Sequence, residues 1–254
     1  MKKPNHIQFA AIVGLIFFLL WIALAINPLD RKDWALENAI AVVCITYLAF
    51  TVRRFPLSRI SYTLLFIFLC LHEIGAHYTY SEVPYDAFFE AVFGKSLNGM
   101  LGWERNHFDR LVHLLYGLLL AYPIREIFLR VADVKGFWSY FLPLDVTMST
   151  SMLFELIEWA AAEIFGGDLG VAYLGTQGDI WDAHKDMALA SFGAVIAMSV
   201  TALININLQR DFAQEWSHSI RVKSRLPLGE DEIRRLWRRK RRAKDGENRS
   251  ADNP

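Results

Sequence analysis

Long apolar runs are the feature that most constrains how this chain can fold. The first, residues 7–26, contains no charged side chain, and its 20 residues are enough to cross the hydrocarbon core of a bilayer as a helix. Further runs of this kind follow. Hydrophobic residues make up 54% of the chain, which is more than an ordinary soluble domain contains. The sequence therefore predicts an all-α, polytopic integral membrane bundle.

We expect about six transmembrane helices. They are predicted at residues 7–26, 35–52, 60–80, 108–124, 138–164 and 187–208, with a polar loop over 81–107. A cleaved signal peptide is the alternative for the first run, because Ala23-Leu24-Ala25 resembles a small-residue cleavage site, but the length of the run favours a retained helix. The transmembrane domain is thus expected to cover residues 1–208.

Residues 209–254 are expected to form a basic tail on the cytoplasmic side. From residue 208 onward the chain holds 13 Lys and Arg against 8 Asp and Glu. Ile233, Leu236 and Trp237 share one face of a short helix predicted within 229–244, which is typical of a segment that lies on anionic lipid rather than on nucleic acid; the end is expected to be disordered. The Lys/Arg bias of the short loops places both termini in the cytoplasm.

Ionisable residues occur in pairs on four of the predicted helices. The pairs are Glu73 with His77, Asp109 with His113, Glu155 with Glu158, and Asp182 with Asp186. Members of a pair are three or four residues apart, so each pair occupies one face of its helix. With six alternating spans, all four pairs lie near the outer ends of their helices, at a depth where charged groups are costly and usually functional. The pattern predicts one polar pocket open to the extracytoplasmic side.

This pocket has the residue types of a metal site or an acid/base site. Carboxylates and imidazoles that face inward from several helices can hold a divalent metal, and this mixture suits Zn, Mn or Fe. The metal ligands are predicted to be Asp109, His113, Asp186, Glu73 and His77, and the catalytic groups Glu155, Glu158 and Asp182. A metal-free acid/base site is one alternative. In a purely structural interpretation, Arg110 or Lys185 neutralises the acids and the cluster fixes helix packing.

Two further features have simpler interpretations. Cys44 and Cys70 lie in apolar runs, and the chain has no C-x-x-C motif, so both are expected to be core thiols. The glycine-rich stretch 166–178 is expected to permit tight turns, or to let the backbone approach a ligand closely.

Several of these residues occur in motifs of known families. The run Asp109-Arg-Leu-Val-His113-Leu-Leu-Tyr116-Gly117, the motif Glu155-Leu-Ile-Glu158-Trp159 and the run from Gly175 to Asp186 resemble the YjdF family of bacterial inner-membrane proteins. The resemblance covers nearly the whole chain apart from the tail, and it implies a location but no reaction, because the function of that family is unknown. A fainter resemblance, to the VanZ-like membrane proteins, is carried by Asp109, His113, Glu155 and Asp182.

The function expected from these features is that of a membrane-embedded enzyme acting on a lipid or lipid-linked envelope substrate. A transporter that captures a cation with the same acids is one alternative, and a non-catalytic membrane scaffold is the other. A transporter needs a polar route through the inner half of the bundle, where the predicted helices offer few polar residues.

Overall fold

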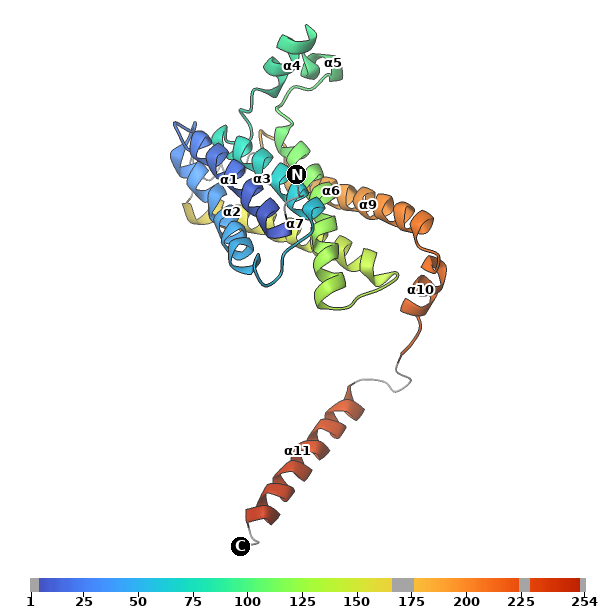
Figure 1. Ribbon diagram of the computed structural model, residues 1–254. Coiled ribbons are helices and arrows are strands. Elements are labelled where there is room, and N and C mark those ends of the chain that lie inside the picture. The colour runs from blue at the N-terminus through green and yellow to red at the C-terminus, as the bar shows by residue number, and fades with distance from the viewer. Residues whose placement is uncertain (1–4, 166–175, 224–228, 252–254) are drawn as a thin grey trace. The chain divides into compact units, whose positions relative to one another are not determined.

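A computed structural model describes residues 5–165, 176–223 and 229–251, and all regular elements in these ranges are helices (Figure 1). The helices are α1 (His6–Leu24), α2 (Arg31–Thr51), α3 (Arg59–His77), α4 (Tyr85–Phe93), α5 (Leu97–Leu101), α6 (Phe108–Val131), α7 (Trp138–Phe165), α9 (Asp182–Leu208), α10 (Phe212–Ser219) and α11 (Glu230–Ala251).

Five of the described helices are long and apolar enough to cross a membrane: α1, α2, α3, α6 and α9. The remaining predicted span corresponds to α7, which has 28 residues but is too polar to count among them. The cause is its acids, Asp145, Glu155, Glu158 and Glu163. The chain is a polytopic helical membrane bundle, as the sequence predicted.

Side-chain caps determine where the first three helices begin. Asn5, Asp30 and Ser58 each accept a hydrogen bond from a backbone N–H in the first turn of the helix that follows. Asn5 and Gln8 form a capping box, in which each side chain bonds to the backbone of the other. These caps stabilise the helix starts at the polar links between the apolar runs.

Contacts between helix ends show that α1, α2, α3 and α6 alternate in direction. At one end of the bundle the backbone N–H of Leu29 donates to the carbonyl of His77, at 3.0 Å, which brings the turn between α1 and α2 to the end of α3. At the other end the backbone N–H of Ser58 donates to the Glu126 carboxylate at 2.9 Å, which joins the start of α3 to the last turns of α6.

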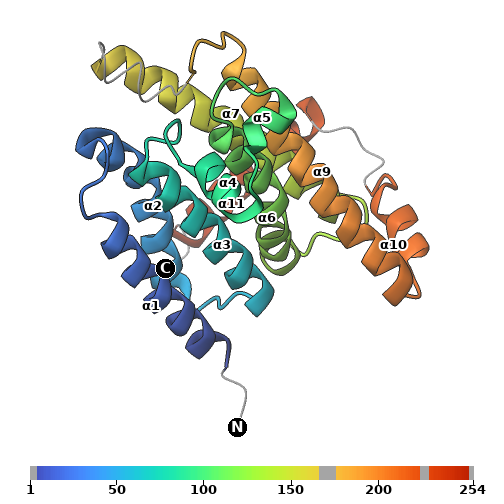
Figure 2. The same ribbon diagram turned by 90° about the horizontal axis from the view of Figure 1, so that it is seen from above.

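The helix α6 lies at the centre of the bundle and packs on α3, α7 and α9 (Figure 2). Its contact with α9 is close because both helices have a glycine there. A Cβ at Gly117 would overlap the carbonyl oxygen of Ala190, and a Cβ at Gly193 would overlap that of Leu114. Small residues let helix backbones approach in a membrane, where apolar burial provides little driving force. The crossing fixes α6 against α9 next to the predicted site residues.

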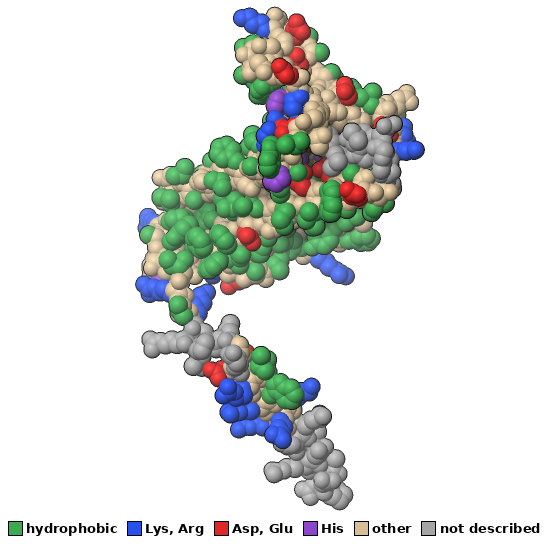
Figure 3. Space-filling model, turned by 180° about the vertical axis from the view of Figure 1, so that it is seen from behind, with side chains coloured by type: hydrophobic (Ala, Val, Ile, Leu, Met, Phe, Trp, Pro, Cys, Tyr) green, Lys and Arg blue, Asp and Glu red, His purple; other side chains and the backbone are tan. Residues whose placement is uncertain are grey.

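Large apolar side chains point away from the bundle along the candidate spans. Leu15, Leu19, Val43 and Phe50 are all at least 60% exposed. Figure 3 shows hydrophobic side chains over most of one face of the long helices. A continuous apolar surface of this extent is a liability in water but is the normal lipid contact of a membrane protein.

The segment 81–107 differs from the prediction of a polar loop, because it contains α4 and α5. Both helices are short and end at a glycine in the left-handed conformation, Gly94 and Gly102. The Asp86 carboxylate joins the two helices by accepting hydrogen bonds from the Ser96 hydroxyl and the Asn98 backbone N–H. Their apolar runs are too short to span a bilayer, so the pattern of long apolar runs predicted no helix in this segment.

Several boundaries also differ from the prediction. The helix α2 begins at Arg31 rather than at residue 35, and α9 begins at Asp182 rather than at residue 187. The helix α6 continues past Pro123 to Val131, and the chain separates into compact units Met1–Ser219 and Ile220–Pro254 rather than at residue 208. The first unit is longer because Trp216 of α10 packs on Tyr140 of α7. In the second unit α11 extends to Ala251, so the described part of the expected disordered end is helical.

Candidate functional site

Asp109, His113 and Asp186 form a group of possible metal ligands among the described residues. One ligand atom of each lies within 4.8 Å of those of the other two. Nε2 of His113 is 3.5 Å from Oδ1 of Asp109, on the first turns of α6. Asp186, near the start of α9, is 2% exposed, and no described residue hydrogen-bonds its Oδ1. Three of the five predicted metal ligands therefore come together.

The helix α7 brings two of the three predicted catalytic residues, Glu155 and Glu158, to the same end of the bundle. Oε1 of Glu155 lies 3.6 Å from Nε2 of His113, and it has no hydrogen-bond partner in the described part of the chain. Glu158, about one turn further along α7, lines the cavity that also borders Asp109 and His113. Glu155 thus contacts the possible metal ligands, while Glu158 faces the adjoining space.

Asp182 lies nearby, but its carboxylate is occupied by arginines. Arg105 donates to both of its oxygens, at 2.6 and 3.1 Å, and Arg110 donates to Oδ1 at 3.0 Å. Arg110 and Lys185 also bond to Asp179 in the turn before α9, and Lys185 contributes most to holding the pKa of Asp179 well below its usual range. In this part of the cluster, cations neutralise the acids, which is the arrangement expected if these residues have a purely structural role.

The other two predicted metal ligands lie away from the group of three. Glu73 is fully buried on α3, which packs on α2. Nδ1 of His77 is 2.7 Å from the carbonyl oxygen of Leu24, so the imidazole joins the end of α3 to the end of α1. A four-residue spacing places two side chains on one face of a helix, but it does not determine toward which neighbour that face turns.

The helix α2 contributes two acids that the sequence analysis did not single out. Asp33 and Glu37 are 2% and 5% exposed, and both line the same cavity as Asp109 and His113. They are four residues apart, as in the other pairs, so the signal was present. The pair was missed because the predicted span began at residue 35. Asp33 was therefore assigned to a polar link and Glu37 to a helix, so the two were not recognised as a pair on one helix.

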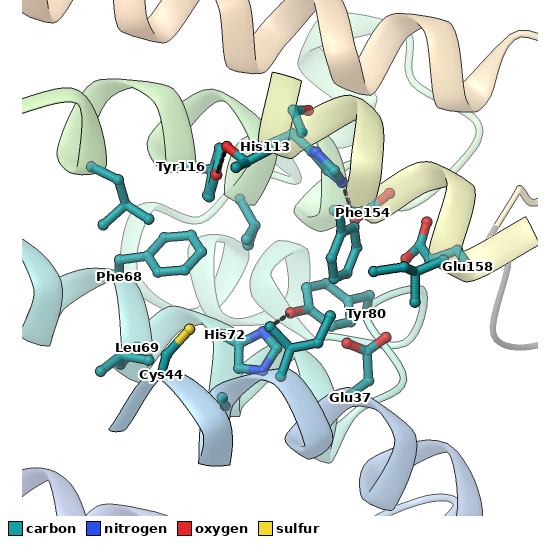
Figure 4. Close-up of a pocket in the computed structure, with 18 of the residues that line it drawn as sticks. Glu37, Cys44, Phe68, Leu69, His72, Tyr80, His113, Tyr116, Phe154 and Glu158 are labelled. Atoms are coloured by element: carbon teal, nitrogen blue, oxygen red, sulfur yellow. Dashed lines mark hydrogen bonds and ion pairs between the residues drawn. The ribbon is translucent and has the colours of Figure 1, made fainter. Parts of the chain in front are cut away.

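These residues surround a cavity of about 420 Å³ between α2, α3, α6 and α7. Its walls divide into a polar end and an apolar end. Figure 4 shows Glu37 and Glu158 reaching one side of the cavity from opposite walls, with Phe68, Leu69 and Cys44 on the other side. Cys44 is therefore not a core thiol as predicted, since it is exposed on the cavity wall.

The turn after α3 folds Tyr80 back into the cavity. Its hydroxyl lies 2.5 Å from Nδ1 of His72, and a Cβ on Gly75 would overlap its ring. Thr79 and Tyr80 both have a φ of +54°, a left-handed conformation that is unfavourable for such residues and persists only where the surroundings impose it. Sequence reasoning gave no signal for this arrangement, which brings a hydroxyl and an imidazole to the cavity wall.

Most of the predicted glycine-rich stretch, residues 166–175, lies outside the described residues. In the part that is described, Gly178 has a φ of +85°, which favours glycine. Arg105 donates a hydrogen bond to the carbonyl of Thr176 at 3.1 Å, so the described end of this stretch is held close to the start of α6.

The fold and its cavity define a multi-pass helical membrane protein with an acidic and histidine-containing site at one end of the bundle. The chain belongs to the family described as "Predicted membrane protein (DUF2238)", whose model matches residues 9–207. It is 34% identical over 200 residues to the inner membrane protein YjdF of Escherichia coli strain K12, which covers 78% of this chain and 91% of that protein. No solved structure matches the chain.

These comparisons confirm the predicted family and a multi-pass location in the inner membrane. They do not show the fainter likeness to VanZ-like proteins. The family description gives no reaction, so the function has to be argued from the cavity itself.

Proposed function

We propose that this chain is a membrane-embedded enzyme that acts on the headgroup of a lipid or lipid-linked substrate. The observation that carries the proposal is the division of one cavity into a polar end and an apolar end. Its volume, about 420 Å³, is in the range of small-molecule sites. An amphiphile matches such a cavity, because its headgroup is polar like one end of the cavity and its chain is apolar like the other end.

The shape of the cavity supports a substrate that lies along the helices. On α2 the lining residues run from Asp33 through Cys44 to Leu48. At 1.5 Å per residue this corresponds to about 22 Å of helix rise, against a hydrocarbon core of about 30 Å. The acids are at the start of α2 and the apolar residues are deeper, so the chain of the substrate would extend toward the middle of the bilayer.

The cavity also reaches the lipid-facing side of the bundle. The helix α2 packs on α3, and α7 packs on α6 and α9, whereas α2 and α7 make little direct contact. Cys44 on α2 and Leu153 and Ile157 on α7 line the cavity and are exposed. Exposure at these depths is exposure to lipid, so an amphiphile can pass sideways between α2 and α7 without its chain crossing water.

We assign a divalent metal, Zn, Mn or Fe, to Asp109, His113 and Asp186. Two carboxylates and an imidazole suit these metals, and three protein ligands leave a position for water, as in catalytic zinc sites. Such a metal would supply a Lewis acid and a water that ionises near neutral pH. The unpartnered Oδ1 of Asp186 fits this assignment, since a buried acceptor without a partner is costly.

The acids of α7 have the positions needed for proton transfer and for holding the headgroup. Oε1 of Glu155 lies 3.6 Å from Nε2 of His113 and accepts no hydrogen bond from the described residues, so it can take the proton from an attacking water. The same carboxylate can then give this proton to the departing group, so the hydrolysis of the headgroup bond leaves Glu155 as it began. Glu158 faces the cavity, where its carboxylate can hold the headgroup in position.

A cation transporter is the alternative function, but the deep end of the cavity has few groups that could bind an ion. The deep walls include Leu48, Leu65 and Leu120, while Thr150 there is bonded to the Tyr116 hydroxyl at 2.6 Å. Among the described lining residues, acids occur only at the other end of the cavity. An ion crossing the bundle would have few groups to replace its hydration.

Lipid turnover tests the proposal. Purified protein would be incubated with vesicles of bacterial inner-membrane lipid and each of the three metals, and the lipids compared by mass spectrometry. We expect wild type to consume a lipid species, Glu155→Gln to lose this activity, and the exposed control Glu163→Gln to keep it. If wild type leaves every lipid class unchanged with all three metals, the enzyme proposal is wrong.

A further inference from the structure

The cavity contains a second acidic group, separate from the proposed metal ligands. It consists of Asp33 and Glu37 on α2 and Glu158 on α7, all of which line the cavity. Asp33 and Glu37 are more than nine-tenths buried. Oδ1 of Asp33 and Oε2 of Glu37 have no hydrogen-bond partner among the described residues. A buried acceptor without a partner is unfavourable, so something other than the described chain is needed to satisfy these atoms.

No described cation is available to these three carboxylates. The described residues that line the cavity include no Lys or Arg. The nearby cations Arg105, Arg110 and Lys185 are bonded to Asp179 and Asp182 instead. The cavity end is therefore rich in acceptors and short of positive charge, and a buried carboxylate is stable only when it is paired.

The two histidines of the cavity do not change this balance. His72 shares its Nδ1 with the hydroxyl of Tyr80, and His113 faces Asp109 and Glu155. A metal held by Asp109, His113 and Asp186 would neutralise its own ligands. The acids on α2, and Glu158 opposite them, would still lack a partner.

We propose that Asp33, Glu37 and Glu158 bind the ammonium group of an amine-bearing amphiphile. This inference rests on the proposed function for placing a substrate in the cavity, and it names the class of headgroup. An ammonium has three N–H donors, which matches carboxylates that approach from two walls. The rings of Tyr80 and Phe154 also line this part of the cavity (Figure 4), and aromatic faces attract cations.

The test is photolabelling of the full chain in an uncharged maltoside detergent. The probe is a long-chain primary amine with a photoreactive diazirine in its chain, compared with the alcohol of the same chain. We expect the amine to label wild type about tenfold more than the alcohol, a ratio that corresponds to about 1.4 kcal/mol. The label should map to cavity residues such as Phe68 or Leu65, rather than to the outward Leu15 and Leu19.

Two charge-removing variants on different helices show whether the acids cause the preference. Glu37→Gln and Glu158→Gln should each reduce amine labelling to the level of the alcohol, whereas Glu163→Gln, exposed on α7 and outside the cavity lining, should leave it unchanged. Equal labelling of wild type by amine and alcohol would overturn the inference. The inference would also be overturned if Glu37→Gln or Glu158→Gln remained monodisperse and still preferred the amine as strongly as wild type.

A third variant separates this inference from the metal assignment. Asp186→Asn removes a proposed metal ligand that does not line the cavity, so it should keep the preference for the amine. Loss of the preference in Asp186→Asn would show that the metal group, and not the second acidic group, selects the headgroup. Lipid turnover by a wild type that shows no amine preference would overturn the headgroup inference and leave the enzyme proposal in place.

Discussion

Arg105 and Asp182 are joined by two parallel hydrogen bonds, from Nη1 to Oδ1 at 2.6 Å and from Nη2 to Oδ2 at 3.1 Å. Arg105 lies in the segment before α6 and Asp182 is the first residue of α9, so the pair connects the starts of two helices that cross closely. The Asp182 side chain is 3% exposed and that of Arg105 is 14%. A planar, two-point pair of this kind combines charge with fixed geometry.

The first prediction concerns the stability that this pair provides. Arg105→Gln should destabilise the protein by about 3 kcal/mol, because it leaves a buried carboxylate with one partner fewer. Lys135→Gln is the control, since its ion pair with Asp133 is largely exposed and should contribute less than about 1 kcal/mol. Thermal unfolding in detergent measures both. Equal effects of the two variants would show that the Arg105–Asp182 pair is not a significant structural contact.

The second prediction concerns the crossing of α6 and α9. Gly117→Ala and Gly193→Ala should each destabilise the protein by about 1–3 kcal/mol, because the added methyl group overlaps a backbone carbonyl of the other helix. Gly14→Ala in α1 is the matched control, as no atom lies within 4 Å of its added Cβ. Unfolding temperatures that fall as much for Gly14→Ala as for Gly117→Ala would contradict the close crossing.

These two contacts show what the sequence could and could not predict. Apolar runs give the long helices, because the length of a bilayer-crossing helix is fixed by the bilayer. The spacing of Asp109 and His113 gives a shared face of one helix. Which neighbours that face contacts depends on how the helix is rotated about its axis. This rotation follows from local contacts such as Gly117 against Ala190, and the spacing of residues in the sequence does not determine it.

The α2 acids and Tyr80 illustrate the same limit. The pair Asp33 and Glu37 had the spacing used for the other pairs, but it spanned a predicted helix boundary and was divided. Tyr80 reaches His72 only because two successive residues adopt a left-handed backbone conformation after α3. No residue pattern in the sequence indicates that conformation, since neither residue is a glycine.

The third prediction concerns orientation. Lys and Arg are more frequent in the segments that six alternating spans place with the N-terminus, which predicts that both termini are cytoplasmic. A reporter active only in the periplasm should work when it is fused after Gly94, in the turn between α4 and α5, and should be silent after Asn248. The reverse pattern would place the acidic end of the cavity toward the cytoplasm.

The fourth prediction concerns α11. Ile233, Leu236 and Trp237 are all more than half exposed, among basic residues that each contribute about 1 kcal/mol near an anionic surface. An environment-sensitive dye attached through Leu236→Cys, with both native cysteines replaced by serine, should shift to the blue in nanodiscs of anionic lipid. The shift should disappear in zwitterionic lipid and at high salt. A shift of the same size in zwitterionic lipid would mean that charge does not recruit α11.

The fifth prediction concerns the metal proposed for Asp109, His113 and Asp186, and elemental analysis of the purified protein tests it most directly. After exposure to Zn, Mn and Fe and removal of free metal, wild type should retain about one ion per chain, and less as the pH falls, because these ligands bind metal only when deprotonated. His113→Gln and Asp186→Asn should retain almost none, whereas Asp145→Asn, an exposed acid on α7, should match wild type. The metal assignment would be contradicted if wild type held no metal, or if His113→Gln and Asp186→Asn held as much metal as wild type.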